Sequence, residues 1–488
     1  MQFSGFLKSL LIILFLAMVF FSCRDEGFDT NPSINLKFSA DSLLFDTVFT
    51  TVGSSTRSFK VYNTHNRRIN ISSVSLAGGD QSYFRINVDG SSGTTLRDIE
   101  IDARDSIFIF VEVTIDPVKQ QLPLIIVDSV VFEINNNIQD VKLAAWGQDA
   151  HFIYPNYQDP ESGFQFHLIT ENSTWTSELP YVVYGLAIIA PDITLNIEEG
   201  VRVHFHNNAS LIFLEGSTLK ANGSAEHPIS FQGDRLEDFF RNVAGQWGRI
   251  WFFATSKDHE INYAIIKNGT VGLHVDTIGS TLAPTLTIRN TVIKNMSIAG
   301  LFAQGSHVVA ENLIIADCGE HAAVLALGGT YDFKHCTFAN YQSVNNRRTP
   351  TLVLNNYYED IDGIIQIREM ESFTIANSII YGGLQEEISL DFYPGTNPSY
   401  TFDHCLIRTQ IEVNTPQFAN VIKNLNPQFR NTLQGDYRLK DDSPAIGAGN
   451  PGISAVVPFD ILGNDRSDRS DLGAVQYYEV DEEEEGEK

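Results

Sequence analysis

The residue types best suited to catalysis in this sequence are carboxylates with arginines close to them in the chain. Glu386, Glu387 and Asp391 lie close together, and Arg368 precedes them. Glycoside hydrolysis uses two carboxylates flanking the scissile bond, whereas lyase chemistry uses a base with a cation or calcium ion that stabilises an enolate. The same region also contains Arg347, Arg348, Glu359, Asp360 and Asp362. The sequence does not place these residues together in space, so a solvated acidic loop is the simpler interpretation.

Two groups of residues have the chemistry of metal ligands. His204 and His206 alternate with apolar residues, which predicts both imidazoles on one strand face, but no third zinc ligand is visible nearby. Oxygen ligands of the kind that calcium prefers occur in a group near the C-terminus: Asp460, Asp465, Asp468 and Asp471. Because Arg466 and Arg469 lie among these aspartates, a salt-bridged cap over the last repeat is favoured. We therefore expect no metal site, and calcium is the one cofactor left open.

Four aromatic residues are candidates for stacking against sugar rings: Trp247, Trp251, Tyr357 and Tyr358. Their faces are large and partly polar at the edge, as sugar-binding platforms require. Burial in a core is the alternative for both tryptophans, and for Trp247 it is the favoured one.

Composition limits the partners. The chain has 33 Lys and Arg against 60 Asp and Glu, a net charge of −27, so nucleic acid is not expected as a partner. A polyanionic glycan is disfavoured for the same reason, unless a local basic groove overrides the average charge. Only four cysteines are present, and Cys318, Cys336 and Cys405 are too scattered for a disulfide framework or a metal set.

The N-terminus has the features of an export signal. Lys8 is followed by an apolar run that is too short for a comfortable membrane span but suits a signal peptide over residues 1–22. Cys23 follows a small residue, which predicts lipidation of its thiol and anchoring to a membrane through the lipid. Residues 23–33 form a polar tether. Its Arg24-Asp25-Glu26 resembles the surface-export signal of Bacteroidetes lipoproteins, although a solvated tether explains it equally well.

Short runs of alternating apolar and polar residues divide residues 34–150 into strands, as in Ile107 to Val113 and Val130 to Ile134. This pattern, with Gly- and Asp-rich turns between runs, predicts an antiparallel sandwich of the Ig-like kind. No amphipathic helix of ordinary length is visible.

A repeated pattern begins after residue 179. The aligned segments start at Ile261, Ile288, Ala310, Phe333, Ile375 and Phe402. Spacing of this kind predicts coils that stack about 4.8 Å apart with equivalent residues in ladders. We expect an Asn or His ladder at a bend, through Asn290, Asn312, His335, Asn377 and His404. Two places later we expect an interior stack of Val292, Ile314, Thr337, Ile379 and Leu406. The longer gap between Phe333 and Ile375 fits two short coils, or one coil with an insertion over about 342–372.

Several motifs resemble those of Bacteroidetes-type surface lipoproteins with an Ig-like N-terminal domain and a right-handed parallel β-helix. They include Trp146 to Ala150, Pro191 to Val201, Gln246 to Phe252 and Ser443 to Gly449. The resemblance implies an all-β chain with a pectate-lyase-like superfold. The domains expected after the tether are a sandwich (34–150), a linker (151–178), a right-handed parallel β-helix (179–430), a C-terminal cap (431–480) and a disordered acidic tail (481–488).

Two functions follow as hypotheses. The first is a non-catalytic protein of the outer membrane, lipid-anchored and facing either the cell surface or the periplasm, that serves adhesion or binds a polysaccharide. The rival is a polysaccharide lyase or glycoside hydrolase of the β-helix type. The fold alone does not separate them, because activity depends on sites carried by the fold.

Overall fold

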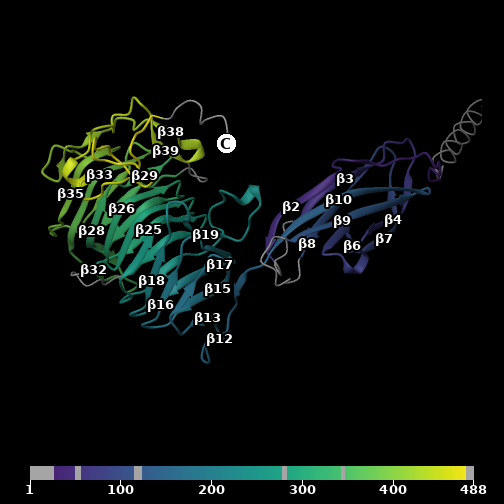
Figure 1. Cartoon of the computed structure of the whole chain (residues 1–488), viewed down its shortest axis with the longest axis horizontal. Helices are drawn as coiled ribbons and strands as arrows, with labels where there is room; N and C mark the ends of the chain where they lie inside the picture. Colours follow the sequence, from purple (N-terminus) through teal and green to yellow (C-terminus); the bar gives the residue numbers. More distant parts are fainter. Residues whose placement is uncertain (1–26, 50–55, 115–123, 277–282, 342–346, 480–488) are drawn as a thin grey trace, which may run out of the picture. The chain divides into compact units, whose positions relative to one another are not determined.

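The computed structural model describes residues 27–49, 56–114, 124–276, 283–341 and 347–479 (Figure 1). The segment predicted to be a signal peptide, Cys23 and the predicted acidic tail lie outside these ranges. The chain divides into two compact units, Met1–Asp149 and Ala150–Lys488, and both are built almost entirely of strands. Within the described ranges, no helix has the length and apolar character needed to cross a membrane.

The N-terminal unit is a sandwich of two five-stranded sheets, ordered β1-β3-β8-β5-β6 and β2-β10-β9-β4-β7. Its strands are β1 (Lys37–Phe38), β2 (Ser42–Phe49), β3 (Arg57–Tyr62), β4 (Ile69–Leu76), β5 (Phe84–Val88), β6 (Ser91–Gly93), β7 (Thr95–Ile101), β8 (Ser106–Val113), β9 (Leu124–Ile134) and β10 (Asn137–Gln148), with a 3-10 turn at η1 (Gly79–Gln81). Alternate residues of β8 are buried, as the sequence pattern predicts. Their side chains join one hydrophobic core with those of the facing sheet.

The C-terminal unit contains a 25-stranded sheet in which most strands pair in parallel with a strand of the following coil. Its strands are β11 (His151–Ile153), β12 (Tyr157–Gln158), β13 (Gln165–Ile169), β14 (Ser173–Trp175), β15 (Tyr181–Ile189), β16 (Thr194–Ile197), β17 (Arg202–Phe213), β18 (Thr218–Asn222), β19 (Ile229–Gly233), β20 (Ile250–Phe252), β21 (His259–Asn262), β22 (Ala264–Lys267), β23 (Val271–Val275), β24 (Leu286–Lys294), β25 (Ala299–Gln304), β26 (His307–Ala316), β27 (His321–Ala326), β28 (Gly329–Lys334), β29 (Thr337–Asn340), β30 (Leu352–Asn355), β33 (Met370–Gly382), β34 (Ile388–Asp391), β35 (Tyr400–Ile407), β36 (Phe418–Ala419) and β37 (Ile422–Lys423). The remaining elements are η2 (Asp238–Phe240), the hairpin β31 (Tyr357–Glu359) and β32 (Ile365–Ile367), the pair β38 (Phe429–Asn431) and β39 (Asp436–Leu439), η3 (Thr432–Gln434) and α2 (Pro451–Ser454).

The six aligned segments pair in the register that the sequence predicts. Successive Cα partners run from Ile261 through Ile288, Ala310, Phe333 and Ile375 to Phe402. Because Phe333 pairs directly with Ile375, the longer gap is a single coil with insertions.

The predicted bend ladder is present, but the predicted interior stack is wrong. The bend residues all have positive φ, between 46° at Asn290 and 52° at Asn312, a region that Asn and His enter more readily than most residues. This bend shifts the inside-outside alternation by one residue. The interior is therefore filled by the neighbouring positions, Ile293, Leu313, Ile315, Cys336, Phe338, Ile380, Cys405 and Ile407. The residues predicted for the interior face outward, and most of them join a second core.

That second core is covered by the C-terminal segment, residues 429–478. Its apolar side chains, among them Tyr437, Ile461 and Leu472, pack on the outward row that contains Ile314, Ile379 and Leu406. Asn312 donates to the Phe459 carbonyl at 2.9 Å, and the Ala474 N–H donates to the Thr337 hydroxyl at 3.0 Å. The segment expected as a cap over the last coil therefore lies along the side of several coils. The bend turns a row of apolar side chains outward, and the C-terminal segment buries this row.

The expected linker over residues 151–178 contains strands instead. β11 and β13 pair in parallel with β15, and β14 pairs with β16. Short, mostly apolar runs such as Phe166 to Ile169, which includes His167, form these strands, but their spacing is less regular than that of the later repeats.

The three cysteines of the C-terminal unit are buried in its interior core. Burial raises the pKa of Cys318, Cys336 and Cys405 to about 12. Since the thiolate is the reactive form, we expect none of the three to react with a maleimide at pH 8 until the chain is unfolded. Mass-spectrometric mapping of labelled peptides in native and denaturing buffer tests this, and labelling of any of the three in native buffer would contradict it.

Candidate functional site

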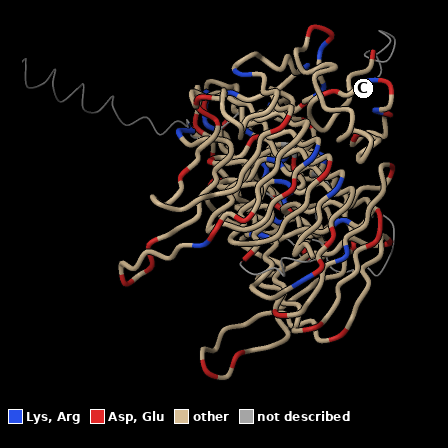
Figure 2. Tube along the Cα trace, turned by 90° about the vertical axis from the view of Figure 1, so that its left-hand side faces the viewer, with Lys and Arg blue, Asp and Glu red and all other residues tan. Residues whose placement is uncertain are grey.

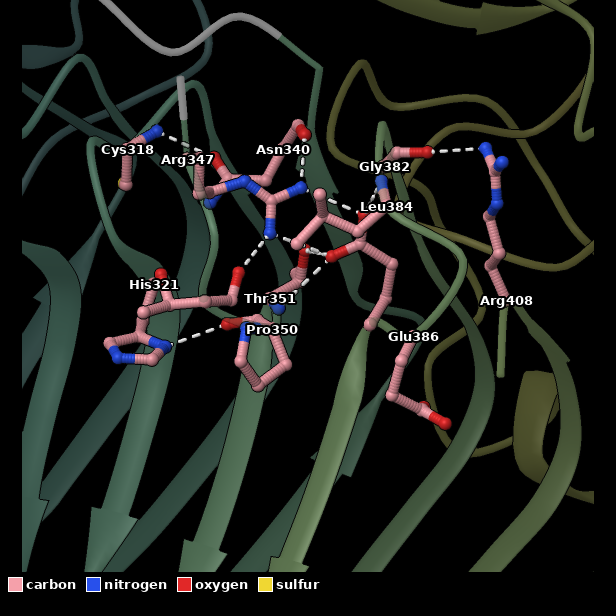
Figure 3. A network of polar contacts seen from close by, with 12 residues as sticks. Cys318, His321, Asn340, Arg347, Pro350, Thr351, Gly382, Leu384, Glu386 and Arg408 are labelled. Atoms are coloured by element: carbon pink, nitrogen blue, oxygen red, sulfur yellow. Dashed lines mark hydrogen bonds and ion pairs between the residues drawn. The ribbon is translucent and has the colours of Figure 1, made fainter. Parts of the chain in front are cut away.

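Glu387 lies in an enclosed polar network, and Figure 3 labels its partners Arg347, Thr351 and Leu384. Its side chain is fully buried and makes a two-point ion pair with Arg347, at 2.7 and 2.8 Å. Its oxygens also accept hydrogen bonds from the Thr351 N–H and hydroxyl and from the Leu384 N–H. With these donors around it and no exposed surface, the carboxylate holds the start of β30 to the loop before β34 and is not placed for attack on a substrate.

Glu386 points away from this network (Figure 3). One of its oxygens accepts from the Thr409 hydroxyl at 2.6 Å, and the other accepts from the Gln410 N–H at 2.8 Å. The two adjacent glutamates therefore serve separate loops, and the structure does not bring them together as an acid and base pair.

The other predicted residues of this region lie on or beside the β31–β32 hairpin. Tyr357 donates to Asp391 at 3.1 Å, and this bond together with the carboxylate charge raises the pKa of the Tyr357 hydroxyl. Tyr358 is about half exposed on the same hairpin. Arg368 is exposed as well, and its backbone N–H donates to the Asn356 carbonyl. No contact between Arg368 and the three predicted carboxylates occurs among the described residues.

The two predicted tryptophans have different environments. Trp247 is fully buried, stacks on Phe205 with ring centroids 4.3 Å apart and donates to the Lys267 carbonyl. It is therefore a core residue and not a sugar platform. Trp251 lies outside the interior core, stacks on His274 and donates to Asp276 at 2.9 Å. One of its faces is covered by that imidazole.

The residues weighed as metal ligands have other partners. The His206 ring bonds to Asp234 at 2.7 Å, whereas His204 is buried beside the Gly233 carbonyl. Asp460 is buried and accepts from the backbone of Leu462, Asn464 and Gln476. Over the described ranges, no group of three or more metal-ligating side chains is present.

Arg466 and Arg469 were expected to form salt bridges with the neighbouring aspartates, and the structure shows one for Arg469. Arg466 is buried and donates to four backbone carbonyls, those of Val457, Phe459, Gly473 and Ala474. Arg469 pairs with Asp471 at 2.8 Å. These bonds hold the C-terminal segment in its folded path along the coils.

A groove of about 610 Å³ lies where the C-terminal segment meets the outer face of β22 and β24. Its floor is apolar and includes Ile265 and Val292. Polar and aromatic side chains line it from both sides: Tyr263, Asn290, Lys294, Tyr437, Arg438 and Tyr478. The volume and the mixture of apolar floor and few polar groups are typical of ligand sites.

Tyr263 is the unusual residue of the groove. It stands at the bend position that Asn or His occupies in the later coils, and its φ is +48°. A bulky side chain in the left-handed region costs free energy, and such strain concentrates at functional sites. The repeat alignment carried this signal, since Tyr263 is its only exception to Asn or His at the bend.

Opposite Tyr263, Arg438 is held in place by the C-terminal segment. It forms a two-point ion pair with Asp436 at 2.7 and 2.9 Å and donates to the Tyr478 hydroxyl at 3.3 Å. Sequence reasoning missed this side of the groove, because its two walls are far apart in the chain.

Comparisons with known proteins give no assignment of family. No protein-family model matches the chain, and no curated protein matches it. Among solved structures, the PapD-like domain 7 of human CEP192 aligns with 27% of this chain and 96% of its own, at 10% identity and a TM-score of 0.18. The catalytic domain of a GH87 α-1,3-glucanase aligns with 77% of this chain and 92% of its own, at 11% identity and a TM-score of 0.14. A family 123 glycoside hydrolase from Clostridium perfringens aligns with 29% of this chain and 30% of its own, at 8% identity and a TM-score of 0.19. TM-scores this low support no transfer of activity; the chain is an all-β protein with a sandwich unit and a large parallel sheet.

Proposed function

We propose that the chain is a lipid-anchored cell-envelope protein that binds a glycan in the groove between Tyr263 and Tyr478. In this proposal the stacked coils form a right-handed parallel β-helix behind an Ig-like sandwich, and Cys23 carries the lipid at the outer membrane, with the body exposed on the cell surface. The partner is a polysaccharide and not a nucleic acid.

The observation that carries this proposal is the strained Tyr263 at the groove wall. Tyrosine rings pack against the apolar faces of sugars, while charged groups such as that of Lys294 fix the orientation of hydroxyls. Tyr263 is strained at the bend, where Asn or His would be more stable, but its ring lines the groove. This combination supports a binding role for the groove.

Catalysis has less support as an alternative. A polysaccharide lyase or glycoside hydrolase needs an accessible acid or base, and Glu387 is enclosed by donors. Glu386 and Asp391 are engaged by Thr409 and Tyr357.

The variant Tyr263→Asn tests the proposal. Asparagine suits the left-handed bend, so we expect the variant to be at least as stable as the wild type, with a gain of up to about 1 kcal/mol. Loss of the ring should weaken glycan binding by about tenfold, equivalent to about 1.4 kcal/mol. A glycan array followed by calorimetry on the full-length chain in neutral detergent measures binding, and thermal unfolding measures stability.

The matched control is Tyr157→Asn on β12, a partly exposed tyrosine that does not line the groove, which should bind as the wild type does. Unchanged binding by Tyr263→Asn, or shortened or unsaturated products in the same mixtures, would argue against a binding site in the groove.

A further inference from the structure

A row of outward side chains changes from lysine to alanine and tyrosine along the coils of the C-terminal unit. Lys267 pairs with Lys294 in the parallel ladder, and Lys294 pairs with Ala316. The row then continues through Ala339 to Tyr381, which the C-terminal segment covers. The lysines therefore occupy the coils just before the covered part of the face, and Lys294 also lines the groove.

Two arginines extend this cationic region. Arg202 is exposed on β17, in the adjacent row of the same face, where it pairs with Ser230. Arg241 lies in the loop after β19 and is exposed. Asn268 donates to the Arg241 carbonyl at 2.9 Å, and this bond ties the loop to the coil that carries Lys267.

The four cations Arg202, Arg241, Lys267 and Lys294 form no ion pairs in the part of the chain that the structure describes. Acidic residues nevertheless outnumber basic ones by 60 to 33 in the chain. Burial lowers the pKa of Lys267, and the charges of Lys294 and Arg241 lower it further. Figure 2 shows many of the Asp and Glu residues at the tips of projecting loops.

Like charges on neighbouring rungs repel each other, so this arrangement is unfavourable until an anion is present. Lys267 and Lys294 are one rung, about 4.8 Å, apart, and a chain with repeated anionic groups can contact both. Each contact would be a charge-assisted hydrogen bond. Lys294 lines the groove and pairs with Lys267 on the preceding rung, so a linear ligand that extends from the groove past Lys294 would reach Lys267.

We propose that the groove selects an acidic glycan, whose carboxylate or sulfate groups lie against Arg202, Arg241, Lys267 and Lys294. This inference rests on the proposed glycan-binding function and names its ligand class. It reverses the expectation from net charge alone, because these four cations form no ion pair among the described residues.

The test compares three oligosaccharides of equal length on the full-length chain in neutral detergent: an oligogalacturonate, a chondroitin sulfate fragment and a neutral cello-oligosaccharide. We expect one of the two acidic probes to bind at least about tenfold more tightly than the neutral one, with an affinity that falls as salt is raised. The double variant Lys267→Gln and Lys294→Gln should lose at least about tenfold in affinity for the acidic probe.

The matched control is Lys220→Gln with Arg289→Gln, which removes the same charge from residues paired with Glu260 and Glu311. It should bind within about twofold of the wild type. Should the lysine variant unfold, Arg241→Gln in the exposed loop gives an independent measurement, with a smaller loss in the same direction.

The outcomes separate the two proposals. Equal binding of neutral and acidic probes, or full affinity in the lysine variant, overturns the acidic-glycan inference and leaves the glycan-binding proposal standing. Equal affinity for duplex DNA and the acidic probe also overturns it, because the face would then be an unselective cation patch. Binding of none of the three probes overturns both.

Discussion

Replacing Glu387 with alanine is expected to lower the free energy of unfolding of the C-terminal unit by about 3–5 kcal/mol, the usual cost of breaking a buried ion pair from one side. The Arg347 guanidinium, whose side chain is only 4% exposed, would lose both of its carboxylate contacts. The Thr351 hydroxyl and the Leu384 N–H would lose their acceptor as well. Denaturant unfolding followed by tryptophan fluorescence measures the effect, because Trp175, Trp247 and Trp251 all belong to this unit.

A double-mutant cycle with Arg347→Ala separates the pair from its surroundings. Removing both charges should cost clearly less than the sum of the single losses, because most of each single loss is the remaining unpaired charge. Glu359→Gln on the exposed hairpin serves as the control and should change stability by less than about 0.5 kcal/mol. An unfolding midpoint of Glu387→Ala equal to that of the wild type would show that the network carries no stability.

This pair lies at the long repeat of the sequence. The coil from Phe333 to Ile375 has to accommodate the insertion before β30 and the β31–β32 hairpin. The ion pair between Arg347 and Glu387 fastens the end of the first insertion to the next coil. The sequence indicated carboxylates and arginines here as catalytic candidates. Because this pair is buried, we infer that its role is structural.

The order of the coils was predictable from the sequence, whereas the direction of the side chains was not. Apolar and Asn or His positions recur at fixed offsets, so the alignment found the correct partners from Ile261 to Phe402. The inside and outside faces depend on the backbone at the bend. A positive φ at Asn312 turns Leu313 inward and Ile314 outward, and residue types alone do not distinguish two aliphatic neighbours.

The groove was beyond sequence reasoning because it depends on where a distant segment packs. The path of residues 429–478 follows from the outer apolar row, which became visible only when the faces were known. One part of the site did leave a local signal, since Tyr263 breaks the Asn or His ladder. Lys267 and Lys294 left a second signal in the sequence, because two successive repeats of an acidic chain have lysine at the same position.

Acidification from pH 8 to pH 5 is expected to remove about 6 kcal/mol of stability from the C-terminal unit, through three buried histidines. Burial lowers the pKa of His204 to about 4, of His259 to about 3 and of His335 to about 2. The unfolded chain protonates each imidazole near pH 6.5, but the folded chain does not. Stability therefore falls as the pH drops below 6.5, by about 2 kcal/mol per histidine at pH 5.

Hydrogen bonds to two of the three rings act in the same direction as burial, the main cause of the low pKa values. The Leu219 N–H donates to Nδ1 of His259 at 2.9 Å, so that nitrogen has no room for a proton. Asn377 donates to Nε2 of His335 at 3.1 Å in the same way, and the charge of Arg466 adds to the cost of a cation there. His335 also contacts Ser454 of the C-terminal segment, so protonation should loosen this segment and the groove that it helps to form.

His335→Asn isolates one of the three contributions. Asparagine occupies the same bend position in other coils and does not titrate, so the variant should lose about 2 kcal/mol less than the wild type between pH 8 and pH 5. The quantity compared is the change in the free energy of unfolding between pH 8 and pH 5. The cost of the smaller side chain is the same at both pH values and cancels in this difference. His227→Asn, which removes an exposed imidazole, is the control and should keep the wild-type difference. If His335→Asn keeps it too, His335 is not a source of the acid sensitivity, and the burial of its ring against the C-terminal segment would have to be doubted.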